Sequence, residues 1–286
     1  MKDIVNKITV LSKLNLLSFI NGFILMSLFQ YPILFILGII SMHIMVYYLV
    51  WSSVSTKPVL TEIKNQYQLN LLDIRYIIIW AIIEGISYQF VNLQKNDNIW
   101  YNIVTFIPVT FLCEIVYDLV FYLHHYISHK NKAIYRLLHK THHQHHNNIN
   151  IISLYYTDPI DIIINAIYII IITYLVPIYE LQFFIWIFHK LVVELAGHSG
   201  TDDNHSCFSQ FIFIPRLLDI DLNKADHFLH HLSSTYNYSK RFSLWDKVFG
   251  TYQPYKTKNK IENRYQLPLY IRIIMGVSLL IMGYLS

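Results

Sequence analysis

The chain has 286 residues, of which 54% are hydrophobic and only 14% charged, with a mean hydropathy of +0.36 and a formal net charge of +4. This composition excludes an ordinary soluble domain and favours an all-α integral membrane protein. The modest charge, without a Lys/Arg run, gives no indication of a nucleic-acid partner. With only Cys113 and Cys207, a disulfide framework is excluded, and a polar part facing the reducing cytosol is expected.

Apolar stretches predict membrane hairpins along the chain. Four stretches are long enough for membrane helices: residues 16–51, 76–123 with a polar break at 94–98, 160–193 and 267–285. The first has a turn signal at Gln30-Tyr31-Pro32, and the third has Pro177 near its middle. We expect the first stretch to be a retained anchor, because no small-residue cleavage site follows it. The last stretch either spans the bilayer or lies against its surface.

The stretches divide the chain into three parts: N-terminal transmembrane hairpins (1–117), a histidine-rich catalytic domain that includes the hairpin at 160–193 (118–264), and a C-terminal apolar segment (265–286). Because a hairpin returns the chain to the side it left, every histidine cluster falls on the side of the N-terminus. Basic residues mark that side as cytosolic: Lys2, Lys7, Lys13, Lys130, Lys132, Arg136 and Lys140. The glycosylation sequons that begin at Asn204 and Asn237 then stay unmodified.

Fourteen of the fifteen histidines lie between Asp118 and His231. Eight of them form three spaced clusters: His125-x-x-x-His129, His139-x-x-His142-His143 and His227-x-x-His230-His231. Imidazole is the commonest side-chain metal ligand and suits iron, zinc and copper. Three ordered clusters in a membrane chain therefore predict a polynuclear metal site.

Helical geometry separates ligands from neighbours in the first cluster. At about 100° per residue, Asp118, Tyr122, His125 and His129 share one face, whereas His124 points away. A carboxylate and a phenol on that face are suited to fixing the tautomers of the imidazoles. The alternative is that Asp118 simply ends a membrane helix near the headgroups.

The second cluster predicts a helix with an apolar arc opposite its imidazoles. The arc contains Ile134, Leu137 and Leu138, and the other side carries His139, His142 and His143. Neighbouring side chains on a helix diverge by about 100°, so two adjacent histidines can serve two metals.

A ninth ligand is expected at His198. Lys190, Glu194 and His198 are spaced four apart and share a helix face where the third hairpin returns to the side of the clusters. The third cluster has its own polar neighbours, Asp226 and Asn237. Three other histidines are not expected to be ligands: His43, His189 and His205.

These motifs resemble the fatty acid hydroxylase superfamily, the membrane-bound non-haem di-iron oxygenases that include the sterol desaturases. The resemblance runs from Asp118 to Tyr252 and includes the Asn-Tyr, Trp-Asp and Gly-Thr-Tyr sequences that follow the third cluster. Only ten positions separate His129 from His139, whereas acyl-CoA desaturases place their first two boxes much farther apart. Two departures stand out: Tyr126 replaces a frequent Arg, and Asp158-Pro159 replaces a His-Pro pair. Asp158 must then replace that histidine, or fewer groups surround the metals.

The resemblance implies two irons, O2 as co-substrate, and hydroxylation or desaturation of a lipid, with a sterol as the first expectation. A close variant acts on fatty acyl, sphingoid or alkylglycerol chains. Electrons would come from a separate donor such as cytochrome b5 with a reductase, because no His-Pro-Gly-Gly haem segment is present. The endoplasmic reticulum is the implied location. Two alternatives remain, a histidine-rich metal transporter or metal-binding protein, and a non-catalytic relative.

Overall fold

Helices form nearly all of the regular structure in this computed structural model, which describes residues 2–55, 57, 60, 69–96, 98–145, 149–201, 210–211, 213–255 and 269–285. The longer helices are α1 (Lys2–Leu28), α2 (Pro32–Val54), α3 (Leu71–Ser87), α4 (Ile99–Lys130), α6 (Pro159–Leu175), α7 (Glu180–Gly197), α9 (Lys224–Ser233) and α11 (Leu269–Leu285). Short helical segments are η1 (Tyr88–Phe90), α5 (Lys132–Ile134), η2 (Tyr135–His139), η3 (His142–His145), η4 (Ile151–Leu154), α8 (Ile214–Leu217) and α10 (Leu244–Val248). Among the described residues, extended pairing is limited to two isolated bridges. The predicted all-α class is confirmed.

The helices of the three predicted hairpins are present as α1–α2, α3–α4 and α6–α7, but only α1 and α2 pack against each other as a hairpin. Helix α3 instead packs against α2 and α6, and α7 packs against α1, α2 and α4. The turn between α1 and α2 precedes Pro32, whose fixed φ suits the first turn of a helix. Asn98 accepts a hydrogen bond from the backbone N–H of Tyr101 and so caps α4. Backbone hydrogen bonds join the second hairpin turn to the third, from Gln94 N–H to Ile178 O at 3.0 Å and from Glu180 N–H to Gln94 O at 3.0 Å.

Three helices are long and apolar enough to cross a bilayer: Leu11–Leu28 of α1, Pro32–Val54 and Ile99–Lys130. Pro159–Leu175 and Tyr270–Leu285 are apolar but shorter. Large apolar side chains on the outer face of the first hairpin are exposed, including Leu16, Ile33 and Leu37. Such a surface is stable only in lipid, so the chain is an integral membrane protein.

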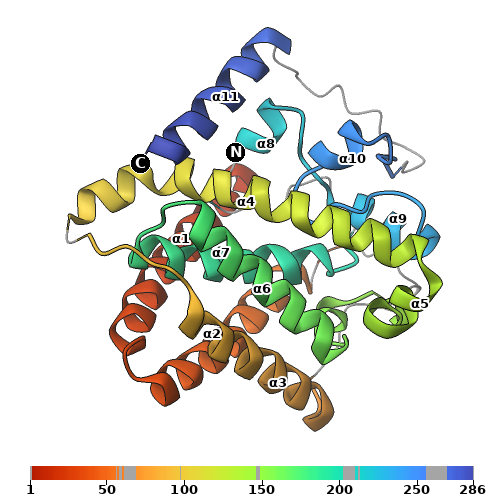
Figure 1. Cartoon of the computed structure of the whole chain (residues 1–286), viewed down its shortest axis with the longest axis horizontal. Coiled ribbons are helices and arrows are strands. Elements are labelled where there is room, and N and C mark those ends of the chain that lie inside the picture. Colours follow the sequence, from red (N-terminus) through yellow and green to blue (C-terminus); the bar gives the residue numbers. More distant parts are fainter. Residues whose placement is uncertain are drawn as a thin grey trace.

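Helix α7 is the centre of the bundle (Figure 1). Every side chain from Leu181 to Ala196 is buried, and the helix packs against α1, α2 and α4. On the opposite face of α4, α11 crosses closely because Gly283 lies against the backbone of Pro108, where a Cβ would collide with the carbonyl oxygen. The bundle therefore fixes the C-terminal ends of α4 and α7 relative to each other.

The segments that carry histidines gather at one end of the molecule. Figure 1 shows the C-terminal end of α4 beside α5 and α9, with the loop that precedes α4 at the other end. The expected single helix through the second cluster is wrong. Residues 132–145 instead form one α-helical turn, a π-helical turn and a 3-10 turn. Leu137 of the expected apolar arc is 62% exposed and does not pack into the core.

Candidate metal centre

All nine histidines expected to be ligands lie in two groups. The five-histidine group contains His125, His129, His139, His143 and His230, and the four-histidine group contains His142, His198, His227 and His231. Within each group, the candidate ligand atoms all lie within 4.8 Å of one another. Residues from α4, the 135–145 turns, the end of α7 and α9 thus converge, although His125 and His231 are separated by 106 positions in sequence.

Adjacent histidines separate into different groups. His142 and His143 leave the 3-10 turn in different directions, and His230 and His231 do the same on α9. The i, i+4 pair His227 and His231 stays together, with Nε2 atoms 3.2 Å apart. The two groups are neighbours, because the ring of His143 stacks on that of His231 with centroids 4.6 Å apart. This matches the expectation that one HxxHH segment can serve two sites.

The Nε2 atoms face one another at distances that suit a shared cation. In the five-histidine group, His139 Nε2 lies 2.9 Å from His125 Nε2 and 3.0 Å from His143 Nε2. In the four-histidine group, His198 Nε2 lies 3.3 Å from the Nε2 atoms of both His142 and His227. A metal about 2.0–2.1 Å from each nitrogen, with ligand angles between tetrahedral and octahedral, places neighbouring nitrogens about 2.9–3.4 Å apart. The spacing therefore fits metal coordination.

Backbone carbonyls set the tautomers of three imidazoles. Nδ1–H is donated by His125 to Tyr238 O at 2.6 Å, by His230 to Tyr236 O at 2.7 Å, and by His198 to Glu194 O at 2.9 Å. A carbonyl can only accept, so each of these Nδ1 atoms carries the proton and each Nε2 presents a lone pair. Several lone pairs that face each other in a buried site are stabilised by a cation, and this donor set suits iron, zinc or copper.

Burial keeps the imidazoles neutral. Desolvation lowers the pKa of His198 to about 4 and that of His230 to about 3. It also lowers the pKa values of His143, His227 and His231, and neighbouring imidazoles add to the shift. Neutral imidazole is the form that binds metal, so the groups are ready to bind it at physiological pH.

Asp118 and Tyr122 lie on the expected face of α4 but do not contact the imidazoles as expected. The Asp118 carboxylate accepts backbone N–H groups from Lys240, Arg241 and Phe242, at 2.8, 2.8 and 3.1 Å. The Tyr122 hydroxyl pairs with Thr251 Oγ1 at 3.0 Å. Asp118 therefore anchors the 238–242 segment, which carries the Tyr238 carbonyl that contacts His125.

Asp246, which the sequence suggested only as part of a motif, completes this anchor. Its carboxylate accepts the N–H groups of Tyr238 and Ser239 at 2.8 Å each, and the Thr251 hydroxyl at 2.7 Å. Residues 238–242 thus rest on two buried carboxylates. The hydrogen bonds between this segment and Asp118 of α4 join residues far apart in the chain, so no local sequence pattern predicts them.

Asp226 and Asn237 hold α9 to the segment that follows it. Asp226 accepts the Tyr255 N–H at 2.8 Å. The Asn237 amide donates to Asp226 O at 2.9 Å and to Gln253 O at 2.7 Å. Asn237 is fully buried at a φ of +57°, a conformation that Asn tolerates, so its sequon is not open to a glycan. Asn204, the start of the other sequon, lies outside the described residues.

In the region expected for Asp158, the carboxylate that approaches a ligand belongs to Asp161. Asp161 Oδ2 lies 3.8 Å from His139 Nδ1, where it can orient the imidazole. Asp158 stands at the N-terminal boundary of α6 and is half-exposed. The carboxylate beside a candidate ligand is thus that of Asp161, three positions after Asp158 in the sequence.

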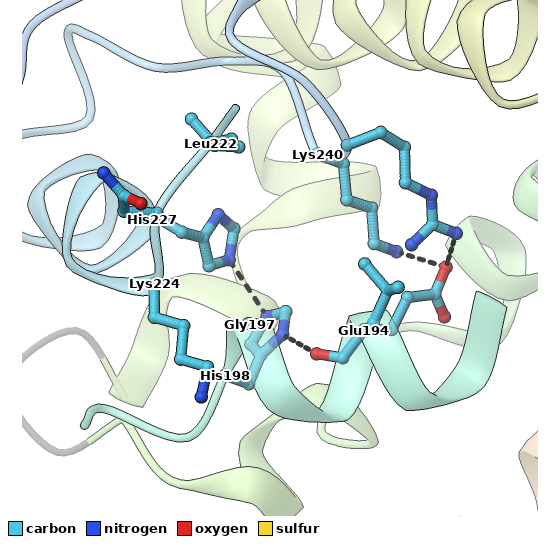
Figure 2. Close-up of a pocket in the computed structure, with 10 residues that line it drawn as sticks. Glu194, Gly197, His198, Leu222, Lys224, His227 and Lys240 are labelled. Carbon is cyan, nitrogen blue, oxygen red and sulfur yellow. Dashed lines mark hydrogen bonds and ion pairs between the residues drawn. The ribbon is translucent and has the colours of Figure 1, made fainter. Parts of the chain in front are cut away.

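Glu194 belongs to a buried ionic network beneath the four-histidine group. The ion pairs are Arg241–Glu194 at 2.8 Å, Lys240–Glu194 at 3.1 Å, Lys190–Glu194 at 3.4 Å, Lys190–Glu84 at 2.9 Å and Arg241–Glu114 at 2.9 Å. Three carboxylates are balanced by three cations, as charges buried in a low-dielectric interior require. Figure 2 shows Glu194, Lys240, His198 and His227 around one pocket. Its volume of about 20 Å³ has room for about one water.

Sequence reasoning named only Lys190 and Glu194 of this network and missed its other charged members, Glu84, Glu114, Lys240 and Arg241. Glu84 interrupts the apolar helix α3, and His43 was excluded because it has no partner at ligand spacing. In the structure His43 Nε2 lies 3.0 Å from Glu84 Oε2. The signal that could have revealed this site is an ionisable residue, Glu84, within an otherwise apolar helix. His189 is a buried core histidine, in contact with Phe106 and Phe188, and His205 lies outside the described residues.

Known proteins share the histidine-bearing part of the chain. The family model for fatty acid hydroxylases matches residues 110–251. Methylsterol monooxygenase 1 of Rattus norvegicus is 26% identical over 151 residues, which cover 52% of this chain and 48% of the relative. Methylsterol monooxygenase 1 of Gallus gallus is 25% identical over 183 residues (62% and 55%). A cholesterol 25-hydroxylase-like protein of Caenorhabditis elegans is 24% identical over 147 residues (51% and 46%).

The chain spans about half the length of these curated relatives. No solved structure matches it. The match covers both histidine groups and the segment that orients them, from α4 to Thr251.

Proposed function

Since the chain belongs to the fatty acid hydroxylase superfamily, we propose that it is a membrane-bound di-iron oxygenase that hydroxylates or desaturates a sterol. The observation that carries the proposal is the convergence of nine imidazoles in two adjacent groups. One iron would be held by the five-histidine group and the other by the four-histidine group. His143 and His231, whose rings stack, would link the two.

Iron bound there supplies the activation of dioxygen and the removal of hydrogen from an unactivated C–H bond. Hydroxylation consumes one dioxygen, two electrons and two protons, and yields the alcohol and one water. Desaturation consumes the same reactants and yields the alkene and two waters. The protein contributes orientation of the imidazoles by the Tyr238, Tyr236 and Glu194 carbonyls, and a buried setting that excludes bulk water.

The names of the relatives support a sterol as the substrate. Two of them are methylsterol monooxygenases and a third is described as cholesterol 25-hydroxylase-like. A sterol dissolves in the bilayer, and the five-histidine group lies at the C-terminal end of α4, a helix long enough to cross a bilayer. Metal transporters, in contrast, place their ligands near the bilayer midplane.

Orientation, location and electron supply are parts of the same proposal. Basic residues near the histidine end, among them Lys130, Lys132 and Arg136, favour a cytosolic face. The endoplasmic reticulum is the proposed location, and electrons come from a separate donor such as cytochrome b5 with its reductase.

The test is lipid profiling of cells with the protein, without it, and with the His142→Ala variant. We expect one sterol that has gained an oxygen or lost a hydrogen pair only when the unmodified protein is present. If a fatty acyl, sphingoid or alkylglycerol lipid shows this change instead of a sterol, that lipid is the substrate and the sterol assignment is wrong. An identical profile in all three cell lines would contradict oxygenase activity.

A further inference from the structure

A basic surface covers the end of the bundle next to the five-histidine group. It is formed by four exposed side chains, Lys130, Lys132, Arg136 and Lys140. The sequence from 119 to 157 contains no Asp or Glu. Among the described residues, none of the four side chains forms an ion pair. We name these four residues the basic surface.

The basic surface is built on the turns that carry metal ligands. Lys130 follows His129, and Lys140 follows His139, whose side chains enter the five-histidine group. On the π-helical turn η2 and at its C-terminal boundary, Arg136 and Lys140 remain outside while His139 is 4% exposed. A molecule that binds the basic surface is therefore within one turn of backbone from the candidate metal site.

Aromatic rings lie between the basic surface and the imidazoles. The Lys130 ammonium stands 5.3 Å from the Tyr126 ring centroid and 5.9 Å from that of Tyr238, which keeps this side chain in place. The Tyr238 ring is 5.5 Å from His129 and 5.9 Å from His125. The Tyr238 ring therefore contacts both the surface cation of Lys130 and two candidate ligands, His125 and His129.

An exposed apolar side chain stands within the charged set. Leu137, a member of the expected apolar arc, is 62% exposed and lies between Arg136 and Lys140 in sequence. Protein interfaces typically combine an apolar contact with a charged rim that steers the partner. A position that exposes leucine among cations is thus suited to a protein contact.

We propose that the basic surface, with Leu137, is the docking site of an acidic electron-carrier protein. This inference rests on the proposed function, which consumes two electrons per turnover from outside the chain. A cationic surface attracts an acidic carrier and orients it, and the carrier then reaches the site over the short contact through His139 and Tyr238. Each docking delivers one electron, so the carrier is oxidised and binds twice per cycle.

The test uses the full chain in nanodiscs and the soluble haem domain of cytochrome b5 as an acidic probe. The variant is the charge reversal Lys132→Glu with Arg136→Glu, both on exposed side chains outside the candidate metal site. Lys132 begins α5, where a carboxylate is compatible with the helix N-terminus. Two controls match it: Lys132→Arg with Arg136→Lys keeps the charge, and Lys95→Glu reverses an exposed charge at the other end of the bundle.

We expect the charge reversal to weaken haem-domain binding and raise its KM by about tenfold at low ionic strength, with less difference at high salt. Both controls should bind like the unmodified protein. Iron content and turnover driven by dithionite should be unchanged in every variant. Leu137→Ser should weaken binding with little change in salt dependence.

Equal haem-domain affinity for the charge reversal and the unmodified protein would overturn the docking surface. The same holds if the reversal changes only the response to phosphatidylserine in the nanodisc, which would assign the basic surface to anionic lipid. Iron-free unmodified protein would instead overturn the proposed function, while the binding measurement would still decide the docking surface.

Discussion

The substitution Asp118→Asn tests whether this buried carboxylate anchors the segment that orients His125. The Asp118 carboxylate is fully buried and accepts three N–H groups of the 240–242 segment. In Asp118→Asn, Oδ1 keeps its bonds to Lys240 and Arg241 without the help of the charge. The new NH2 group replaces Oδ2 and faces the N–H of Phe242. Because both groups are donors, the buried hydrogen bond between them is lost.

The expected cost follows from these contacts. An unsatisfied buried N–H costs about 1–3 kcal/mol, and two charge-assisted bonds that become neutral lose about 1 kcal/mol each. The sum is about 3–5 kcal/mol, which corresponds to a Tm decrease on the order of 10 °C for a chain of this size. Since the segment carries Tyr238, His125 loses its orientation and iron affinity should fall by about 10–100-fold.

Melting in detergent and hydrogen exchange of residues 238–242 measure this prediction. Asp118→Asn should lower the Tm and raise the exchange of these five amides. Asp158→Asn is the matched control, because that carboxylate is half-exposed and its backbone position also suits Asn. An unchanged Tm with unchanged exchange at 238–242 would refute the anchoring role of Asp118.

The remaining predictions concern the ligands, pH and the ionic network. His142→Ala and His230→Ala should each lower iron content and abolish turnover with normal membrane insertion, whereas His124→Ala, outside both groups, should keep its iron; full turnover by either ligand variant contradicts the site. Metal-free protein should lose stability as pH falls below about 6.5, because the unfolded chain then protonates His198 and His230 while the folded protein, with pKa values of about 4 and about 3, does not. Melting curves at several pH values test this, and a pH-independent Tm opposes it. Glu194→Gln should destabilise the protein by about 3–5 kcal/mol, because three buried cations lose a charged partner, although Arg241 and Lys190 keep Glu114 and Glu84; a normal melting temperature would show that the network is not required.

Hydropathy and spacing predicted much of the architecture because both are local properties. Apolar length located the long helices, and the polar breaks located the turns between them, but the packing partners of α3 and α6 did not follow from the chain order. Helical spacing selected His125 over His124 and included His198, since three side chains four positions apart must share a face. The separation of His142 from His143 followed from the angle between neighbours on a helix.

The details that orient the imidazoles could not be predicted, because they depend on contacts between distant segments. A backbone carbonyl such as that of Tyr238 has no sequence signature, whereas Asp118 and Tyr122 share a helix face with the ligands, so the sequence predicts these side chains as the partners. The π-helical turn at residues 135–139 changes the direction of each later side chain, and periodicity alone assumes a regular helix. Glu84 was visible as a charge in an apolar helix, but its partner Lys190 is set by packing.

The most direct measurement of the central claim is the iron content of the purified chain combined with X-ray absorption at the iron edge. Two irons per chain, each surrounded by nitrogen ligands at about 2.1 Å, are expected from the two histidine groups. A chain that holds no iron when expressed with sufficient iron, or irons surrounded mainly by carboxylate oxygens, would contradict the assignment of the nine imidazoles as ligands.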